Sequence, residues 1–235
     1  MRNYFIFDEE DSRNYGVYIS GQAVFDAPAR RGEQIQIPGR NGSLHLDEGC
    51  FENYKLIYPA FIIADFDENV KNLRNMLLSR KGYCKLYDSY HSEEYRLARY
   101  SGGLEVSPIS SLIAGDFDLE FDCHPQRFLR SGDTTQTFTA AGSITNPTLF
   151  ASKPLIRVYG TGTVGIGSYS IKINTANVYT DFDCDIQDAY KGTVSCNSYI
   201  ELSGNKFPVL EPGANGITLG TGITRVEITP RWWRL

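Results

Sequence analysis

Three glycines in the second half of the chain match a motif that can bind a dinucleotide. Gly160, Gly162 and Gly165 have the Gly-x-Gly-x-x-Gly spacing, which holds a pyrophosphate when the glycines open a helix whose N-terminus receives the negative charge. Here the residues that follow, Ser-Tyr-Ser-Ile-Lys-Ile at 168–173, alternate as a strand does. We therefore predict a tight turn between two strands and no nucleotide site.

Three alternating acids resemble the beginning of a calcium-binding loop: Asp181, Asp183 and Asp185. Such a loop needs glycine at its sixth position and glutamate at its twelfth, where this chain has Ile186 and Gly192. Alternating acids are also typical of the solvent-facing side of a strand. We expect the strand, and a weak calcium site at the edge of a sheet is the alternative.

The remaining reactive side chains form no pattern of a known active site. The histidines are expected in a hairpin, a loop and a strand end: His45, His91 and His124. The cysteines have irregular spacings and no Cys-x-x-Cys pair: Cys50, Cys84, Cys123, Cys184 and Cys196. A zinc site needs four ligands together, and hydrolysis needs paired carboxylates or a nucleophile beside a histidine. We predict no enzyme, no metal and no cofactor, and thiols buried in a reducing cell.

Charge and hydropathy limit the partners. The chain of 235 residues has 23 Lys and Arg against 28 Asp and Glu, a net charge of −5, so it has no basic field that would attract nucleic acid. The N-terminus lacks the apolar core of a signal peptide. The most apolar window, Leu56 to Ala64, contains Pro59 and is about half the ~20 residues that span a bilayer. We expect a soluble protein made in the cytoplasm, without membrane insertion.

The first half of the chain predicts a mainly β domain with one helix. The helix is expected after Asp65 or Asp67, which can cap it, with Val70, Leu73 and Leu77 on one face; Gly82 ends it. Strands are predicted around it, the last of them ended by Pro125: Gly16 to Gly21, Leu56 to Ile63, Tyr83 to Tyr87, Tyr95 to Tyr100, Leu104 to Val106 and Gly115 to Cys123. In the last strand the apolar residues alternate with acids, a strong strand signal.

The second half predicts an antiparallel β-sandwich of about a hundred residues, because short strands recur at regular spacing with no helical period. The predicted strands are Gln136 to Thr139, Leu155 to Tyr159, Thr163 to Ile166, Tyr169 to Ile173, Asn177 to Asp181, Gly192 to Ser195, Phe207 to Val209, Gly216 to Leu219 and Thr224 to Ile228. A polar segment from Arg130 to Thr137 reads as the linker, so we predict domains at 1–130 and 131–235. The paired tryptophans at 232 and 233 are expected to anchor the C-terminus by packing; a membrane or ligand patch is the alternative.

A two-stranded arm is predicted between Glu33 and Leu56. Ile35 and Ile37 alternate with polar residues, as do Leu44 and Leu46, and Pro-Gly-Arg-Asn-Gly at 38–42 supplies the turn. A second turn is expected at 47–49 (Asp-Glu-Gly). Two strands alone bury too little apolar surface to be stable, so the arm should lie against its own domain or a neighbouring chain. A surface hairpin without a special role is the simpler alternative.

Several segments of the sequence resemble the distal tail proteins of long, non-contractile-tailed bacteriophages, in order and nearly end to end. These segments are PGRNGSL (38–44), LDEGCFENY (46–54), LLSRKGYCKLYDSYHSEEYRLARY (77–100), LEFDCHPQRF (119–128), PLIRVYGTGTV (154–164), FPVLEPGANGI (207–217) and VEITPRWWRL (226–235). The chain departs from the family in lacking the tryptophan often found late in the helix, where Met76 and Leu77 stand. It also lacks the long insertion that carries carbohydrate-binding modules in some relatives, so direct receptor binding is not expected.

The resemblance implies a structural protein of the virion tail tip, or baseplate hub, with a galectin-like second domain. It implies a homohexameric ring that joins the tail tube protein to a tail-tip protein or a tail-associated fibre or lysin protein, in a phage or a prophage. The hairpin arm helps to join subunits in this family, which places four turn residues at the subunit interface: Gly39, Arg40, Asn41 and Gly42. The alternative function is a carbohydrate-binding β-sandwich module acting in host-surface recognition.

Overall fold

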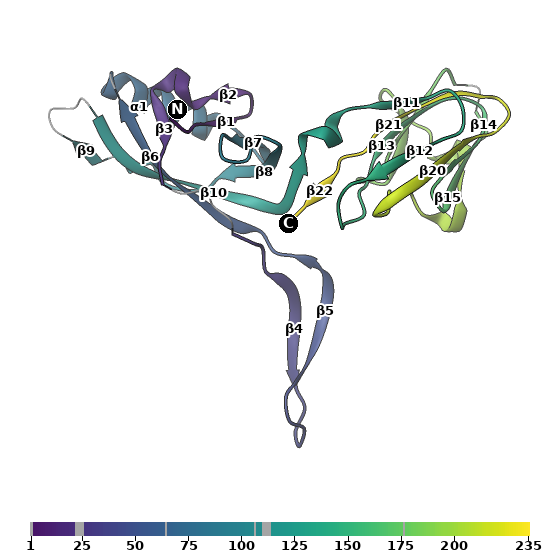
Figure 1. Ribbon diagram of the computed structural model, residues 1–235, viewed down its shortest axis with the longest axis horizontal. Coiled ribbons are helices and arrows are strands. Elements are labelled where there is room, and N and C mark those ends of the chain that lie inside the picture. Colours follow the sequence, from purple (N-terminus) through teal and green to yellow (C-terminus); the bar gives the residue numbers. More distant parts are fainter. Residues whose placement is uncertain (1, 22–25, 64, 106, 110–113, 176) are drawn as a thin grey trace. The chain divides into compact units, whose positions relative to one another are not determined.

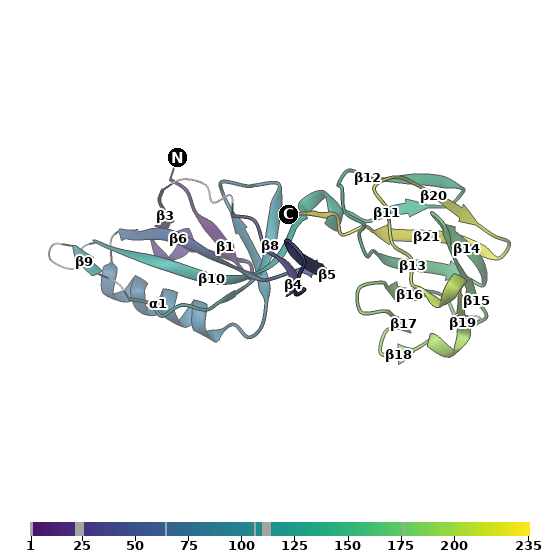
Figure 2. The same cartoon turned by 90° about the horizontal axis from the view of Figure 1, so that it is seen from below.

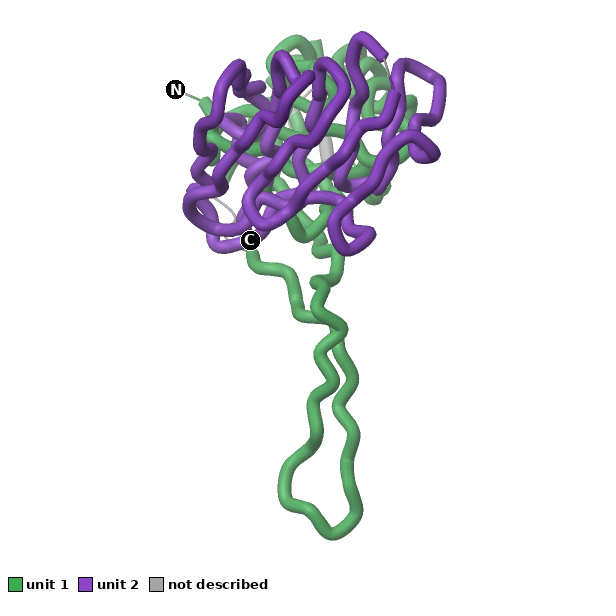
Figure 3. The backbone as a smooth tube through the Cα atoms, turned by 90° about the vertical axis from the view of Figure 1, so that its right-hand side faces the viewer, with its two compact units in different colours: residues 1–127, 235 green, residues 128–234 purple. Residues whose placement is uncertain are grey.

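The computed structural model describes residues 2–21, 26–63, 65–105, 107–109, 114–175 and 177–235. Contacts divide the chain into two compact units, residues 1–127 with Leu235 and residues 128–234 (Figure 3). Both units are built mainly from antiparallel strands, and the longest helix in the described residues belongs to unit 1 (Figure 1). The predicted fold class is confirmed: the chain is mainly β, with one α-helix among the described residues and a hairpin arm. Independent folding of 1–130 and 131–235 stays a prediction.

Unit 1 is built on one sheet with the order β2-β1-β7-β8-β10-β6-β3, and β9 also pairs with β10. Its strands are β1 (Phe5–Phe7), β2 (Glu10–Asp11), β3 (Val17–Ile19), β6 (Tyr54–Ile63), β7 (Cys84–Asp88), β8 (Glu94–Tyr100), β9 (Ser107–Ile109) and β10 (Ala114–Leu129), with a 3-10 turn η1 (Ser12–Tyr15) after β2. The predicted strand Leu104 to Val106 is not formed at 104–105, and residue 106 lies outside the described residues.

The helix of unit 1, α1 (Phe66–Ser79), covers one face of the sheet (Figure 2). Val70, Leu73 and Leu77 are buried in the core, as the spacing predicted. Asp65 holds the N-cap position as predicted, but its backbone is left-handed and its side chain makes no capping hydrogen bond. The helix ends because the backbone of Arg80 becomes extended, two residues before Gly82.

Strand β10 runs through the proline that was expected to end it. The alternation is confirmed in its first part, because the core contains the side chains of Phe117, Leu119, Phe121 and Cys123. Pairing with β6 stops at Cys123, opposite Tyr54. Beyond that point the strand has lost one neighbour, so Pro125, which has no N–H to donate, is accommodated within a strand that continues to Leu129.

Unit 2 is a sandwich of a six-stranded sheet, β11-β21-β13-β16-β17-β18, and a five-stranded sheet, β12-β20-β14-β15-β19. The strands of the two sheets are β11 (Gln136–Phe138), β12 (Gly142–Asn146), β13 (Leu155–Gly160), β14 (Gly162–Ile166), β15 (Tyr169–Ile173), β16 (Thr180–Asp183), β17 (Asp188–Lys191), β18 (Val194–Ser195), β19 (Ile200–Leu202), β20 (Gly213–Leu219) and β21 (Ile223–Thr229). The last strand, β22 (Trp233–Arg234), lies outside both sheets and pairs with β10. Inward residues of both sheets form one buried core, as in other sandwiches.

Several predicted strands of unit 2 are misplaced. The strand expected at Asn177 to Asp181 begins at Thr180, and the one expected from Gly192 begins at Val194, because Gly192 has a positive φ of 62° and forms the turn after β17. The segment Phe207 to Val209 is not a strand; beyond it Leu210 makes an isolated bridge to Ser152. Strands β12, β17 and β19 were not predicted, and two of them are only three or four residues long.

The glycine motif of unit 2 is the predicted tight turn. Gly160 and Gly162 have positive φ angles of 104° and 141° and join β13 to β14. A Cβ on Gly160 would lie 2.1 Å from the carbonyl oxygen of Gly222, so no other residue fits there without a shift of backbone. The next element is the strand β15, so these glycines do not open the helix that the dinucleotide motif requires.

The C-terminal segment anchors unit 2. Trp232 is buried in the core of the sandwich. Trp233 stacks on Phe150 with ring centres 4.5 Å apart, and its indole N–H donates to the carbonyl oxygen of Ala151 at 3.0 Å. The predicted polar linker is not a free loop: residues 130–133 form the 3-10 turn η2 (Arg130–Asp133), and the carbonyl of Gly132 accepts a hydrogen bond from the N–H of Arg231 at 2.8 Å.

Candidate assembly interface

The arm of unit 1 consists of β4 (Arg30–Gln36) and β5 (Ser43–Phe51), which pair only with each other (Figure 1). The antiparallel register sets Ile35 opposite Leu44 and Glu33 opposite Leu46. Residues that lie opposite each other point to the same side of a two-stranded ribbon. The arm therefore has two chemically different faces.

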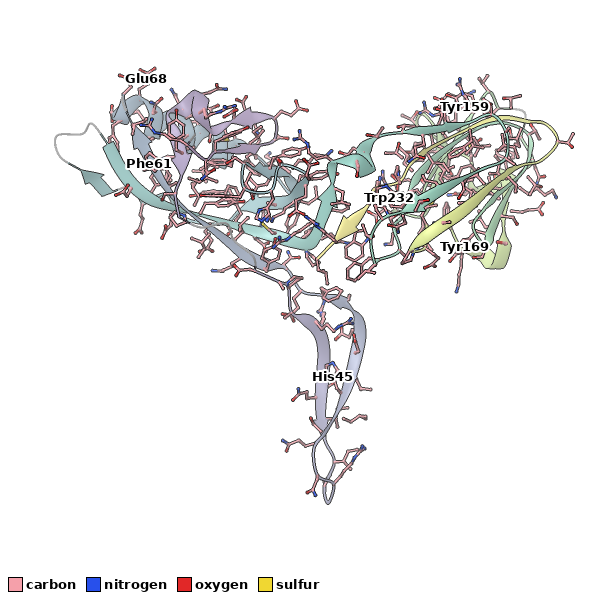
Figure 4. All side chains as sticks on the ribbon, in the orientation of Figure 1. His45, Phe61, Glu68, Tyr159, Tyr169 and Trp232 are labelled. Atoms are coloured by element: carbon pink, nitrogen blue, oxygen red, sulfur yellow. The ribbon has the colours of Figure 1, made fainter. Side chains whose placement is uncertain are left out.

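One face of the arm is apolar and uncovered. It carries Ile35, Ile37, Leu44 and Leu46, which we call the apolar face of the arm, and Glu33, opposite Leu46, lies on the same side towards the base. In the folded chain Ile37, Leu44 and Leu46 remain 40%, 39% and 48% exposed. The opposite face is polar and carries Gln34, Gln36, Ser43 and His45 (His45 is labelled in Figure 4). Exposed apolar side chains that lie together in this way often mark an interaction surface, so this face is a candidate for covering by a partner.

The turn of the arm has the geometry that its sequence predicts. The N–H of Arg40 donates to the carbonyl of Ile37 at 3.1 Å, and Gly39 has a φ of 82°. Together with Pro38 at the preceding position, these features define a type II turn. A Cβ on Gly39 or Gly42 would meet open space, so only the positive φ requires glycine.

The four residues predicted at a subunit interface lie together at the tip of the arm, and all four are exposed. The turn encloses an open hollow of about 650 Å³, lined by Gln36, Ile37, Pro38, Arg40, Asn41, Gly42 and Ser43. Whether Gly39, Arg40, Asn41 and Gly42 touch another subunit stays a prediction.

The second turn predicted at 47–49 is wrong, because β5 runs through these residues with a bulge. Arg30 lies opposite Phe51 but Gly32 lies opposite Asp47, so the chain of β5 has extra residues here. Gly49, with a φ of 72°, supplies the backbone bend. Its N–H donates to the Asp47 carboxylate at 2.8 Å, and this bond, with the nearby Arg30, holds the pKa of Asp47 below its usual value.

The charges of the arm are unevenly paired. Arg30 bonds to Asp47 at 2.9 Å, and Arg31 lies 3.2 Å from Glu48. Within the described part of the chain, Arg40 at the tip has no acidic partner, and neither has Glu33. The tip therefore presents an uncompensated positive charge at the end of the apolar face.

The cysteine prediction is wrong for the arm. Cys123, Cys184 and Cys196 are buried and Cys84 is half-buried, but Cys50 in β5 is exposed. Burial raises the pKa of both the Cys123 and the Cys184 thiols to about 12, so these two are unreactive at neutral pH.

The alternating acids of unit 2 are engaged by cations. Asp181 forms a two-point pair with Arg157 at 2.6 and 2.9 Å, and Asp183 does the same with Arg231 at 2.7 and 3.0 Å. Asp185 bonds to Lys153 at 3.1 Å. The expected solvent-facing role is wrong for Asp181, which is buried. No group of three or more potential ligands in the described ranges is arranged to hold a metal ion.

Burial alone would raise the pKa of Asp183, but the guanidinium of Arg231 and two backbone N–H groups outweigh burial and lower it. The hydrogen bond to Asp181 raises the pKa of Arg157. The Arg231–Asp183 pair ties β16 of the six-stranded sheet to the C-terminal segment, and the Arg157–Asp181 pair joins β13 to β16 within that sheet.

The three histidines lie apart. His45 is on the arm, and His124 lies in β10 with its ring 4.0 Å from that of Tyr83. His91 follows β7, with Nδ1 3.2 Å from the carboxylate of Asp88. The histidines therefore do not assemble one catalytic group.

A buried charge network in unit 1 was not predicted. Asp88 accepts hydrogen bonds from the Tyr58 hydroxyl at 2.6 Å and from Arg96 at 2.8 Å. Burial alone would raise the pKa of Asp88, but Arg96, the Tyr58 hydroxyl and the backbone N–H of His91 lower it. Burial and the neighbouring Asp88 raise the pKa of Tyr58 well above its usual value. The network holds the turn between β7 and β8, and the side chains of Asp88 and Arg96 are buried. Arg96 sits in an alternating strand, where no local signal distinguishes it.

Comparison with known proteins identifies the fold. No protein-family model matches the sequence, and no curated protein matches it. Among solved structures, the SPP1 Dit (gp 19.1) protein, described as a paradigm of the hub adsorption apparatus in phages that infect Gram-positive bacteria, is similar over 100% of both chains, with a TM-score of 0.76 and 16% identity. This chain has the Dit fold.

Two structures of the phage P2 baseplate in its activated conformation, with Ca and with Sr, also contain a similar chain. They cover 97% of this chain and 98% of that one at 11% identity, with TM-scores of 0.50 and 0.51. The resemblance to distal tail proteins is thereby confirmed for the fold. Among the helices that the structure describes, none has both the length and the apolar character needed to cross a membrane.

Proposed function

We propose that this protein is a distal tail hub of a long, non-contractile-tailed phage or prophage. Its subunits form a homohexameric ring in the virion tail tip, made in the cytoplasm of the bacterial host. One side of the ring meets the tail tube protein and the other meets a tail-tip protein or a tail-associated fibre or lysin protein. The role is structural and not enzymatic. The Dit fold supports the proposal, since the likeness extends over 100% of both chains.

The uncovered apolar face of the arm is the observation that carries the proposal. Full burial of one leucine or isoleucine side chain is worth roughly 1.5 to 3 kcal/mol, and three side chains of the face are between 39% and 48% exposed. Covering them therefore stabilises an assembly by about 2 to 4 kcal/mol per arm. An arm that reaches the next subunit makes a head-to-tail contact, and such contacts close into a ring when the rotation allows.

A pair of double variants tests the role of the arm. Leu44→Gln with Leu46→Gln makes the apolar face polar, and Gln36→Ala with His45→Ala changes the opposite face to a similar extent. We expect the first variant to release folded monomers and the control to assemble as the wild type does, measured by light scattering with circular dichroism for folding. Equal assembly of both variants would contradict a role of the apolar face.

A carbohydrate-binding module is the second candidate, and one hollow in unit 2 favours it. The hollow is about 540 Å³ and is lined by Gln187, Asn197, Ile200, Glu201, Leu202, Asn205 and Phe207. Amides around an aliphatic and aromatic floor are suited to sugar hydroxyls and ring faces. Gln187 and Asn205 both have positive φ angles, 57° and 54°, an uncommon backbone that clusters at binding sites. A glycan array with the wild type and Asn205→Ala decides: binding lost in the variant supports this function, and no binding by the wild type excludes it for the sugars on the array.

A further inference from the structure

The face of the unit 1 sheet that points away from α1 has a row of apolar side chains beside a row of acids. Along β6, Leu56, Tyr58, Ala60 and Ile62 are buried in the core, so the alternate residues Ile57, Pro59 and Phe61 point to the opposite side. The register sets Glu120 opposite Ile57, Asp118 opposite Pro59 and Asp116 opposite Phe61.

The two rows form the floor of an open hollow of about 710 Å³. Its residues come from β6, β10 and two bordering loops: Ser20, Ile57, Pro59, Ala60, Gly102, Gly103, Glu105, Asp116, Phe117, Asp118 and Glu120. Ile57 is 44% exposed although it lies in the middle of a strand. At the end of this floor Phe61 stacks on Tyr18 with ring centres 5.8 Å apart (Phe61 is labelled in Figure 4). The described helix covers the other face of the sheet, so this hollow has no cover within unit 1.

The acids of the row are paired at one end and unpaired at the other. Asp122 accepts a hydrogen bond from Tyr83 at 2.6 Å, and Glu120 lies 2.8 Å from the ammonium of Lys55. Asp116 and Asp118 are exposed, and no described cation pairs with either of them. The unpaired negative charge therefore lies in the hollow, beside the apolar row.

We propose that this hollow is the receptor for the arm of a second copy of the chain. The arm's apolar face packs on Ile57, Pro59 and Phe61, and its Arg40 pairs with Asp116 and Asp118. The complementarity is double: an aliphatic ribbon meets an apolar row, and the unpaired cation of the arm meets the unpaired acids of the hollow. This inference rests on the proposed ring and adds the surface that each arm occupies.

The dimensions are compatible. From Ile57 to Phe61 the strand advances by about 13 Å at ~3.3 Å per residue, and the arm from Ile35 to its turn, with the returning strand beside it, covers a patch of similar length. A face-to-face contact of a ribbon with a sheet leaves about 10 Å between the backbones, which two layers of aliphatic side chains fill. The arm of the same chain pairs only with itself and keeps its apolar face exposed, so it does not fill the hollow of its own unit.

A charge exchange tests the pairing. Arg40→Glu places an acid against the acids of the hollow, and Asp118→Lys places a cation against Arg40. We expect each single variant to raise the chain concentration at half-assembly by about tenfold, because a favourable charge contact becomes a repulsive one. The double variant restores the opposite signs and should recover most of the wild-type assembly, measured by native mass spectrometry. Arg74→Glu, on the exposed face of α1, is the matched control and should have no effect.

The outcomes separate the two proposals. If the wild type forms rings and the single variants assemble equally well, or if the double variant is as weak as the singles, the hollow is not the receptor and the ring stands. If the wild type remains monomeric even with its tail partners present, both the ring and the receptor are overturned. Circular dichroism of each variant confirms that a loss of assembly is not a loss of folding.

Discussion

Leu73 should be among the most costly residues of the helix to shorten. Its side chain is fully buried between α1 and the sheet of unit 1. Leu73→Ala removes three carbon groups, worth about 2.4 kcal/mol in transfer free energy at ~0.8 kcal/mol each, and leaves a cavity that adds to the cost. We expect the free energy of unfolding to fall by about 2 to 5 kcal/mol.

The same helix provides a matched control. Leu78 is 63% exposed, so Leu78→Ala removes the same atoms but loses only about 1 kcal/mol of transfer free energy, partly offset by the better helix propensity of alanine. Arg74→Ala, also exposed, should cost less than about 0.5 kcal/mol.

Urea unfolding followed by circular dichroism measures all three variants, with the slope of the transition checked for constancy. Losses for Leu73→Ala and Leu78→Ala that agree within about 0.5 kcal/mol would show that burial on this helix does not determine the cost. The assignment of the core face would then be wrong.

Three further outcomes follow from the contacts of the two units. Asp88 and Asp183 have pKa values lowered in the folded state. Their contribution to the free energy of unfolding is therefore present above the unfolded pKa of about 4 and is lost as the pH falls through the folded pKa. The melting temperature should fall with acid, and it should fall less in Asp183→Asn. Asp181, Asp183 and Asp185 are already paired with cations, so EDTA should leave the melting temperature unchanged, and a drop of several degrees would revive the calcium alternative. A fragment of residues 131–235 lacks Leu129, whose N–H bonds to the carbonyl of Trp232 at 2.8 Å, so it should melt below a fragment of residues 128–235; equal melting would show that this contact is not needed for folding.

Local alternation was sufficient to predict the parts of the fold that depend on one strand or helix. Phe117, Leu119 and Phe121 lie in the core as the period of two requires, and the turn at Pro38 and Gly39 follows from the φ angles that these residues favour. Helix α1 was found for the same reason, because Leu73 and Leu77 share a face.

The errors come from contacts between residues distant in sequence. Asp181 was expected to face solvent, but its partner Arg157 is 24 residues away, on a neighbouring strand. Pro125 was expected to end β10, but a proline disrupts a strand only where its missing N–H would have bonded to a neighbouring strand. Pairing with β6 stops at Cys123, so no residue of β6 lies opposite Pro125. Neither fact is written in the local sequence.

The sequence predicted where the candidate site lies, but not which of its side chains are uncovered or unpaired. The turn residues identify the tip of the arm, and alternation identifies its apolar face. Only the structure shows that this face is left uncovered by its own unit and that Arg40 has no acid beside it within the described residues. The alternation of acids with apolar residues in β10 was predicted, but the difference between the paired Glu120 and the unpaired Asp118 depends on Lys55 of β6.

The mass of the native assembly tests the central claim most directly. Native mass spectrometry of the wild type, and of a variant that lacks Arg40 and Asn41, should show six chains in the first case and folded single chains in the second. The shortened turn cannot extend the arm to a neighbour, while the body of unit 1 keeps its core. A wild-type protein that remains a single chain at high concentration, with the tail tube and tail-tip proteins present, would contradict the hub.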